Sequence, residues 1–498
     1  MGFGLAAIDL SWQQLNPPAQ HLAYVLSLFA HAPIPWELVT DFYRPEFYNQ
    51  KSFWGKLKSF FQKQEIYTTE EINSARKELT KLNLLKRVET ETYLFHSLIR
   101  EFLHTKESQF DASQLKQVVC KVIVAKGEET PQYITVDQVT TLSPVIPHIE
   151  EVATNLANYL TDEDLITPFV SLGRFYEGQG LHNLAEPWLV QGKEIALTHL
   201  GKNHEDTATS LNNLALLYSS QGRYKQAELL YLQAIEIDEI ALPPNHPSLA
   251  NHLNNLANLY YSQGRYEEAE PLYLKAIEID KIALSDNHIS LSIEFNNLAN
   301  LYYSQGRYKQ AEPLHLKAIE IDKIALPPNH PYLAIHLNSL ALLYSSQERY
   351  KQAESLYLKA IEIDKIALPP NHPYLATHLN NLGELYYSQR RYEQAEPLYL
   401  QAIEIDKIAL PPNHPSLATH LNNLAGLHES QGKYEQAEPL YLQALMILFN
   451  SVGQSHPDTK KVWNNFVYFI KQVITEGREK ELSNSTAVQS LIGKIKNE

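Results

Sequence analysis

The feature that most constrains this chain is a sequence repeat with a period of 42 residues. One tyrosine of the repeat recurs at that spacing at Tyr224, Tyr266, Tyr308, Tyr350, Tyr392 and Tyr434. A histidine recurs with the same period at His204, His246, His288, His330, His372, His414 and His456. A fixed period of this length predicts a solenoid, in which each unit buries its apolar face only by stacking on the next. Such a chain offers a long surface, which favours binding or scaffolding.

Composition and charge argue against several other classes of protein. The single cysteine, Cys120, rules out an internal disulfide, and 498 residues suit a solenoid with one small additional domain. We find neither a signal peptide nor the roughly 18 apolar residues of a membrane helix, so we expect a cytoplasmic protein with no membrane partner. The net charge of −15 comes entirely from residues 111–498. We expect no nucleic-acid partner, because phosphate contacts need a basic surface.

Residues 1–106 predict a small helical domain with a short hairpin. Helical patterns cover residues 17–29, 34–43, 51–62 and 68–82, and Thr68 and Thr69 supply an N-cap for the last of these. Two short strands follow at 84–88 and 93–95, and residues 96–103 return to helix. The mixed charges of residues 70–82 argue against DNA binding through this domain.

This N-terminal domain resembles the winged-helix segment of NB-ARC-type signalling ATPases in LSWQQLNPPAQHLAYVLSLFA, KELTKLNLLKR and YLFHSLIREFL. In that family the segment lies between a nucleotide-binding core and a C-terminal repeat sensor. His96 matches the family's nucleotide-contacting histidine, although a structural role is the alternative that we favour. The chain contains no GxxxxGK[ST] loop to cradle phosphates, so we expect no cofactor.

The remaining domain boundaries follow from where the repeated sequence motif begins and ends. Residues 107–165 predict a helical adaptor, and residues 166–472 the repeat array with a single capping helix at its end. Residues 473–498 predict a polar, mobile tail with a short helix at 487–495.

Each repeat predicts two helices, which we name the A helix and the B helix. In the clearest copy the A helix is 247–262 and the B helix is 266–283, with a turn at 263–265. An apolar stripe at Leu253, Leu256, Ala257 and Tyr260 follows the helical period of the A helix. The preceding Asn245–His246 pair is placed to cap that helix.

This pattern of leucine, alanine, tyrosine and turn glycine resembles the tetratricopeptide repeat. The 42-residue length, with AEPLY and NHP segments, is similar to the kinesin light chain type. The resemblance implies an all-α, right-handed solenoid whose A helices line a concave groove, here preceded by the winged-helix-like domain. Glu348 and Arg390 replace the turn glycine in two units, which costs about 1 kcal/mol each if the backbone there is left-handed.

Asparagines recur along the A helices in two series. The first series is Asn212, Asn254, Asn296, Asn338, Asn380 and Asn422. The second series follows directly at Asn213, Asn255, Asn297, Asn381, Asn423 and, in the capping helix, Asn465, with Ser339 as the single exception. An amide both donates and accepts, so a ladder of amides in the groove would hold an extended peptide by its main chain. Groove asparagines grip peptides this way in the kinesin light chain family; the alternative is that these amides bond between adjacent units.

Variable positions one helical turn further on would set the specificity of such a groove. Those that we expect to contact a peptide are Asn258, Asn300, Tyr261, Tyr303 and Tyr387. The middle of the array, around Tyr261 and Tyr303, looks best equipped.

Catalytic and metal-binding arrangements do not stand out. Successive linker histidines lie a repeat apart, too far to share an ion, so helix capping explains them better. Glu278 and Asp280 recur in most B helices, which is typical of solvated faces. We therefore expect a non-enzymatic adaptor that captures a protein or extended peptide in its groove. The alternative is a regulatory part of an NB-ARC-type ATPase, acting with a separate nucleotide-binding signalling domain.

Overall fold

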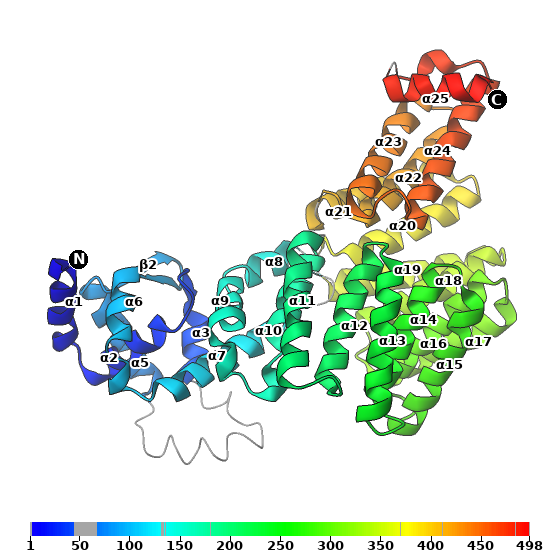
Figure 1. Cartoon of the computed structure of the whole chain (residues 1–498). Coiled ribbons are helices and arrows are strands. Elements are labelled where there is room, and N and C mark those ends of the chain that lie inside the picture. Colours follow the sequence, from blue (N-terminus) through cyan, green and yellow to red (C-terminus); the bar gives the residue numbers. More distant parts are fainter. Residues whose placement is uncertain are drawn as a thin grey trace. The chain divides into compact units, whose positions relative to one another are not determined.

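A computed structural model describes residues 2–43, 67–130, 134, 136–179, 181–368, 370–410, 412–483 and 485–497 (Figure 1). The chain divides into two units. The first comprises Met1–Phe175 with Pro187–Ile195, and the second comprises Tyr176–Glu186 with Ala196–Glu498. Within the described residues, no helix is both long enough and apolar enough to cross a membrane.

The N-terminal domain combines helices with a small antiparallel sheet. Helix α2 (Pro17–Ser27) starts at a proline, where the missing N–H has no cost. Helix α5 (Thr69–Lys81) begins with a capping box in which Thr68 and Glu71 satisfy each other's backbone N–H groups. Strands β2 (Leu85–Glu89) and β3 (Thr92–Phe95) form the predicted hairpin. A third strand, β1 (Ile34–Pro35), pairs with β3 and gives the order β1-β3-β2.

Several N-terminal elements differ from the sequence prediction. Helix α1 (Gly2–Gln14) was not predicted, and the segment predicted as one helix over 34–43 contains β1 before α3 (Trp36–Tyr43). The helix predicted at 51–62 lies outside the described residues. His96 caps α6 (Ser97–His104), since its Nδ1 accepts the N–H of Leu98 at 3.2 Å. The winged-helix resemblance itself stays a prediction.

A buried histidine joins the adaptor helices to α2 and the segment after it. The adaptor consists of α7 (Ala112–Glu128), α8 (Val136–Leu142), α9 (Ile146–Glu151) and short irregular turns up to Asp164. His148 of α9 is fully buried; its Nδ1 accepts from the Ala30 N–H and its Nε2 donates to the Pro33 carbonyl, both at 3.1 Å. Burial lowers the pKa of His148 to about 4, so the ring stays neutral.

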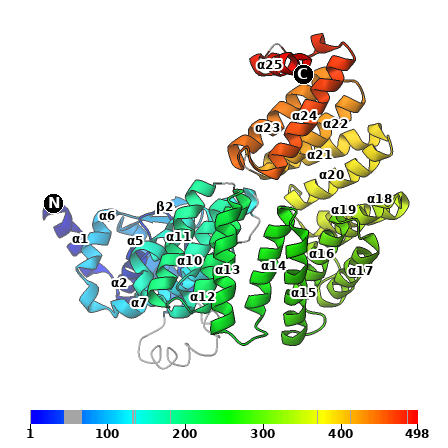
Figure 2. The ribbon, with the colours of Figure 1, turned by 45° about the vertical axis from the view of Figure 1, so that its right-hand side comes forward.

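The repeats form a continuous row of antiparallel helix pairs, seen from two directions in Figure 1 and Figure 2. The row follows α10 (Thr167–Glu177) and α11 (His182–His199). The A helices are α12 (Glu205–Ser220), α14 (Pro247–Ser262), α16 (Ile289–Ser304), α18 (Pro331–Ser346), α20 (Pro373–Ser388) and α22 (Pro415–Ser430). The B helices are α13 (Tyr224–Ala241), α15 (Tyr266–Ala283), α17 (Tyr308–Ala325), α19 (Tyr350–Ala367), α21 (Tyr392–Ala409) and α23 (Tyr434–Ser451). The predicted solenoid is therefore confirmed.

The helix ends within each repeat follow from local chemistry. The bounds of α14 and α15 match those predicted. His246 caps α14 through its Nδ1, which accepts the Ser248 N–H at 3.3 Å, and the other six linker histidines cap their helices in the same way. The predicted stripe from Leu253 to Tyr260 is buried.

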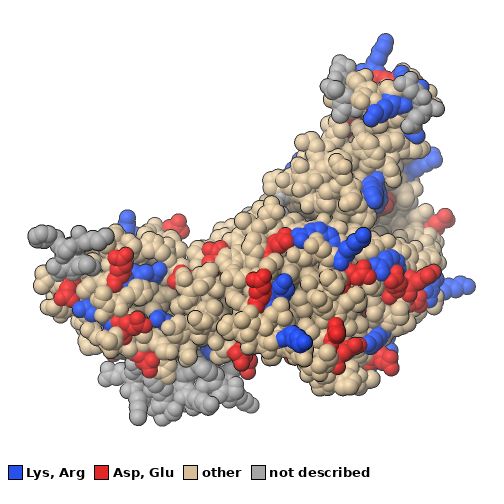
Figure 3. Space-filling view, in the orientation of Figure 1, with Lys and Arg blue, Asp and Glu red and all other residues tan. Residues whose placement is uncertain are grey.

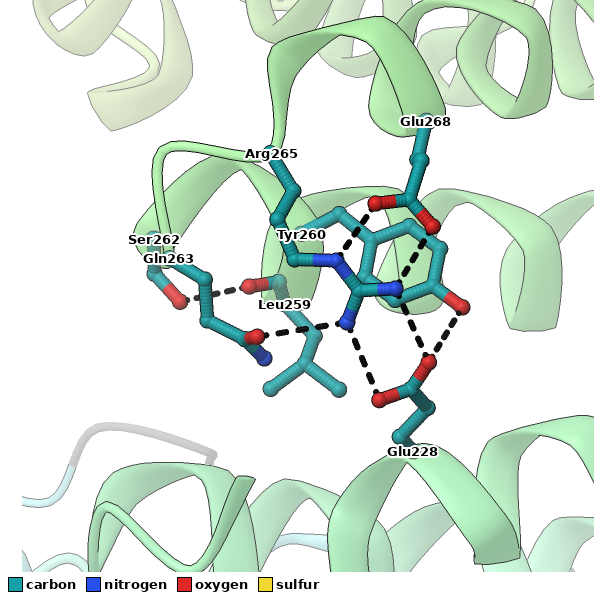
Figure 4. A network of polar contacts seen from close by, with 7 residues as sticks. All are labelled: Glu228, Leu259, Tyr260, Ser262, Gln263, Arg265 and Glu268. Carbon is teal, nitrogen blue, oxygen red and sulfur yellow. Dashed lines mark hydrogen bonds and ion pairs between the residues drawn. The ribbon is translucent and has the colours of Figure 1, made fainter. Parts of the chain in front are cut away.

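A charged cluster ties each turn to the preceding repeat (Figure 4). The guanidinium of Arg265 lies 3.9 Å from the ring centroid of Tyr260 and donates to Glu228 of α13 at 3.0 and 3.1 Å. The Tyr260 hydroxyl donates to the same carboxylate at 2.8 Å. These hydrogen bonds, led by those from Arg265, lower the pKa of Glu228. The arrangement recurs around Arg223, Arg307, Arg349 and Arg391.

The array ends in α24 (Pro457–Thr475), the predicted single capping helix. The short helix predicted at 487–495 is present as α25 (Thr486–Asn497), and the burial of Val488 and Ile492 was not predicted for a polar tail. The backbone N–H of Ser483 also donates to Glu438 of α23 at 2.6 Å. Apolar positions spaced by four residues give α25 a face that docks rather than remains in solvent.

Junctions between repeats contain buried His–Asp pairs that the sequence did not reveal. Each joins the end of a B helix to the next A helix, as in His252 Nδ1 to Asp238 Oδ2 at 2.7 Å. Equivalent pairs are His336–Asp322, His378–Asp364 and His420–Asp406, at 2.6 to 2.9 Å. The interpretation of Asp280 as part of a solvated face is wrong, since only 2% of this residue is exposed. The next A helix covers the inner side of each B helix.

Of the five junctions whose B helix carries this aspartate, one lacks the histidine. Between α15 and α16, Glu294 occupies its position, so two carboxyl groups, Glu294 and Asp280, are buried together. Burial, with a smaller contribution from Asp280, raises the pKa of Glu294 to about 8. Burial also raises the pKa of Asp280 to about 6, against the opposing effect of His288.

This carboxyl pair makes stability depend on pH. In the unfolded chain Glu294 ionises near about pH 4.3, so the folded state loses stability as the pH rises from there to about 8, by at most about 1.4 kcal/mol per pH unit. Glu294→His restores the residue used at other junctions. We expect its unfolding free energy to exceed that of the unmodified chain by an amount that grows between about pH 5 and about pH 8. Urea unfolding at several pH values measures this; a constant difference would contradict it.

The turn position is left-handed in every repeat from Gly222 onward. The glycines Gly222, Gly264, Gly306 and Gly432 have φ of 69 to 72°, and Glu348 and Arg390 each have φ of 59°. The backbone at Glu348 and Arg390 is therefore left-handed, so the predicted cost of about 1 kcal/mol applies to each. Side chains at such φ values are strained, because Cβ crowds the following carbonyl oxygen.

Glu348→Gly and Arg390→Gly should each stabilise the array by about 1 kcal/mol. Urea unfolding of each variant measures the gain. Gly264→Ala is the matched opposite change, since a Cβ there meets nothing within 4 Å and only the backbone is strained. Equal stability of all three variants and the unmodified chain would rule out turn strain as a determinant.

Candidate functional site

The first asparagine series lies in the seams between successive A helices. Its members are 3 to 8% exposed. In most repeats the side-chain Oδ1 accepts a hydrogen bond from the second-series amide of the next repeat. These bonds, at 3.0 to 3.1 Å, are Asn255 to Asn212, Asn297 to Asn254, Asn381 to Asn338, Asn423 to Asn380 and Asn465 to Asn422. We call this row the amide ladder, and it links neighbouring repeats side chain to side chain.

The ladder is interrupted where Ser339 replaces the second-series asparagine. Asn296 would lose its donor there, but the fully buried His315 of α17 takes that role, with its Nδ1 3.1 Å from the Asn296 Oδ1. Burial lowers the pKa of His315 to about 3, so the ring is neutral. Sequence reasoning missed His315, although it stands where other repeats have a tyrosine such as Tyr273.

Part of the hydrogen-bonding capacity of the ladder is unused. Among the described residues, the Nδ2 groups of Asn212, Asn254 and Asn338 have no acceptor, and none of them is sealed from solvent. Asn380 and Asn422 instead donate to the adjacent Asn381 and Asn423 at 3.4 and 3.3 Å. The ladder therefore presents unpaired amide donors along the A helices.

The predicted specificity positions also join neighbouring helices. The half-buried Tyr261, Tyr303 and Tyr387 share hydrogen bonds with a serine of the next A helix at 2.8 to 2.9 Å. Tyr273 donates to the Oδ1 of Asn258 at 2.6 Å. Asn300 is half-buried on the same face. The three tyrosines and Asn258 thus have a packing role between helices and remain half-buried.

A cavity of about 420 Å³ opens on this face in the last repeats. Residues of the five helices from α20 to α24 line it, including Glu384, Tyr387, Asn422, Gly426, Glu429 and Tyr441. Of the predicted site residues, Asn422, Asn423 and Tyr387 are thereby brought together. This cavity lies nearer the C-terminus than Tyr261 and Tyr303, where the sequence placed the best-equipped part of the groove.

Charge on the visible surface shows no single-sign patch. Lys and Arg are interspersed with Asp and Glu in the space-filling view of Figure 3. Among the residues that the structure describes, no three His, Cys, Asp or Glu side chains are grouped to hold a metal ion.

Stacked helix pairs with a shared A-helix face define a helical-repeat protein, and comparisons with known proteins specify the family. Models of the tetratricopeptide repeat match residues 164–240, 249–290, 289–366 and 374–448. The chain therefore belongs to the tetratricopeptide-repeat family. A search of curated proteins finds no match.

Solved structures with related folds include three of different kinds. A kinesin light chain-like protein from Podosopora anserina with nearly identical TPR-like repeats is 25% identical, covering 41% of this chain and 96% of that one, with a TM-score of 0.36. The quorum sensor NprR from B. thuringiensis is 18% identical, covering 70% and 92%, with a TM-score of 0.48. A STAND protein with a tetratricopeptide-repeat sensor from Pyrococcus horikoshii is 16% identical, covering 91% and 66%, with a TM-score of 0.43. These TM-scores are low, so the family assignment rests on the repeat models.

The amide ladder predicts a measurable coupling between three positions. Asn297→Ser removes the donor to Asn254 and should lower the free energy of unfolding by about 0.5–1.5 kcal/mol. Adding Tyr273→His recreates the arrangement of Asn296, His315 and Ser339, so the double variant should recover part of that loss. A double-mutant cycle by urea unfolding measures the coupling. Strictly additive effects would contradict the proposed replacement of one donor by another.

Proposed function

We propose that this protein is a scaffold that captures an extended polypeptide on the A-helix face of its repeat array. The observation that carries the proposal is the row of unpaired Nδ2 donors at Asn212, Asn254 and Asn338. An extended peptide presents main-chain carbonyl oxygens that are free to accept, whatever its side chains are. Repeated donors on a rigid scaffold suit such a ligand.

The ladder also supports preorganisation of these donors. Each Oδ1 accepts from the next repeat, so the amide plane is fixed before a ligand arrives. Fixing a donor in advance lowers the entropy lost on binding. The half-buried ring of Tyr261 lies two turns after Asn254 on α14, and Tyr303 and Tyr387 hold the equivalent positions of α16 and α20. These rings supply apolar contact area along the A-helix face.

Replacing asparagine by the isosteric aspartate separates its acceptor role toward the next repeat from its proposed donor role toward a ligand. Asn254→Asp with Asn338→Asp keeps the oxygens that accept from Asn297 and Asn381 but replaces both outward donors by acceptors. Peptides selected from a display library against the full chain serve as probes. We expect the double variant to bind them about ten-fold more weakly or worse, because two hydrogen bonds to the main chain are lost.

A matched control has the same charge change elsewhere. Asn245 and Asn329 are exposed linker residues, and their conversion to aspartate should leave binding unchanged. Thermal unfolding is recorded for all variants. If the ladder variant is destabilised yet binds the peptides as before, or if no library peptide binds the unmodified chain, the proposal is wrong.

A further inference from the structure

The cavity in the last repeats exists because one A-helix position has no side chain. Gly426 of α22 occupies the position that holds Leu216, Asn258, Leu342 or Glu384 in other repeats. A Cβ at Gly426 would meet only the hydroxyl of Tyr441, at 3.7 Å. A glycine inside a helix is destabilising compared with leucine. Its presence in α22 keeps open a space that a larger side chain would fill.

The walls of this cavity are acidic and aromatic. Glu384 and Glu429 supply carboxylates, and the tyrosines include Tyr387 and Tyr441. Lys and Arg are absent from the lining residues. Tyr441 donates to Glu429 at 2.7 Å, while neither glutamate forms an ion pair with a described residue. Burial raises the pKa of Glu429, so this carboxylate lacks the solvation or cation that would stabilise its charge.

The same two kinds of group receive an arginine elsewhere in this chain. In Figure 4 the guanidinium of Arg265 stacks on the ring of Tyr260 and donates to the Glu228 carboxylate. Repeat after repeat, tyrosine faces and a carboxylate thus bind a guanidinium by stacking and directed hydrogen bonds. The cavity around Glu429 and Tyr441 offers a tyrosine ring and a carboxylate but contains no arginine of its own.

We propose that this cavity binds the guanidinium of an arginine side chain from a captured polypeptide. Its volume of about 420 Å³ falls within the range of small-ligand sites, ~300–1,000 Å³. The carboxylates of Glu384 and Glu429 accept from the guanidinium, and the tyrosine rings cover its planar faces. The assignment rests on the proposed function and adds an anchor residue to it. An arginine in the bound segment therefore sets the register of the peptide along the A helices.

The test uses the full chain and a small probe, N-acetyl-arginine amide, so that it does not depend on the rest of the groove. Calorimetry and saturation-transfer NMR measure its binding. Citrulline has the same shape without the charge, and we expect N-acetyl-citrulline amide to bind about ten-fold more weakly or worse. N-acetyl-lysine amide should also bind more weakly, because an ammonium lacks the planar fork.

Substitutions in the cavity test whether the arginine probe binds there. Gly426→Leu places in the cavity the residue used at Leu216 and Leu342, and should abolish binding. It should not lower the melting temperature, since leucine favours helix. Glu429→Gln keeps the acceptor for Tyr441 and should weaken the arginine probe about ten-fold. Leu342→Gly, at the equivalent position of α18, is the control and should leave probe binding unchanged.

Four outcomes would overturn the assignment. They are no binding of the arginine probe, equal binding of citrulline, equal binding of lysine, and unchanged binding by the Gly426→Leu variant. The peptide-capture proposal fails separately. Library peptides that still bind a chain without probe binding would leave capture standing, and probe binding without any library peptide would leave only the cavity.

Discussion

Contact between neighbouring repeats is the constraint on which this structure depends. A single helix pair buries only part of its apolar surface, so each repeat is stable only against the next. Three polar contacts recur at those junctions: the amide ladder, the His–Asp pairs and the stacked arginines. Each contact joins residues about one repeat period apart or less along the chain. The stability of the array is therefore a sum of terms between neighbouring repeats.

The polar residues of the A helices serve stacking and surface chemistry together. Asn254 uses its oxygen within the seam, while its nitrogen has no acceptor among the described residues. A ligand that accepted from several such nitrogens would contact several repeats and so favour their stacked arrangement. Binding and array stability are then linked, because both depend on the same orientation of each amide. Asparagine can do both because its donor and acceptor are separate atoms, whereas serine has a single oxygen and an ionised aspartate has no donor.

Departures from the repeat carry more information than the repeat itself. Ser339 is accompanied by His315, which supplies the missing donor to Asn296. Glu294 leaves two carboxyl groups buried together where other junctions have a His–Asp pair. Gly426 opens a cavity where other repeats have a side chain. A near-identical background makes each change interpretable, since the same backbone position shows the alternative residue in its ordinary setting.

The sequence by itself determined the period, because near-identical segments recur along it. It also determined the helix bounds within the repeats, the histidine caps and the turn strain at Glu348 and Arg390, because these depend on residues a few positions apart. It could place both asparagine series on the A helices, but not choose between ligand contact and bonding across the seam. Only the tertiary structure decided that Asp280 is buried, that Asn297 donates to Asn254, and that the cavity opens at Gly426. Helix α1 and strand β1 also escaped prediction. The contacts across the seams could not be predicted because a side chain's partner 43 residues away depends on the angle at which helices stack. No local sequence pattern encodes that angle.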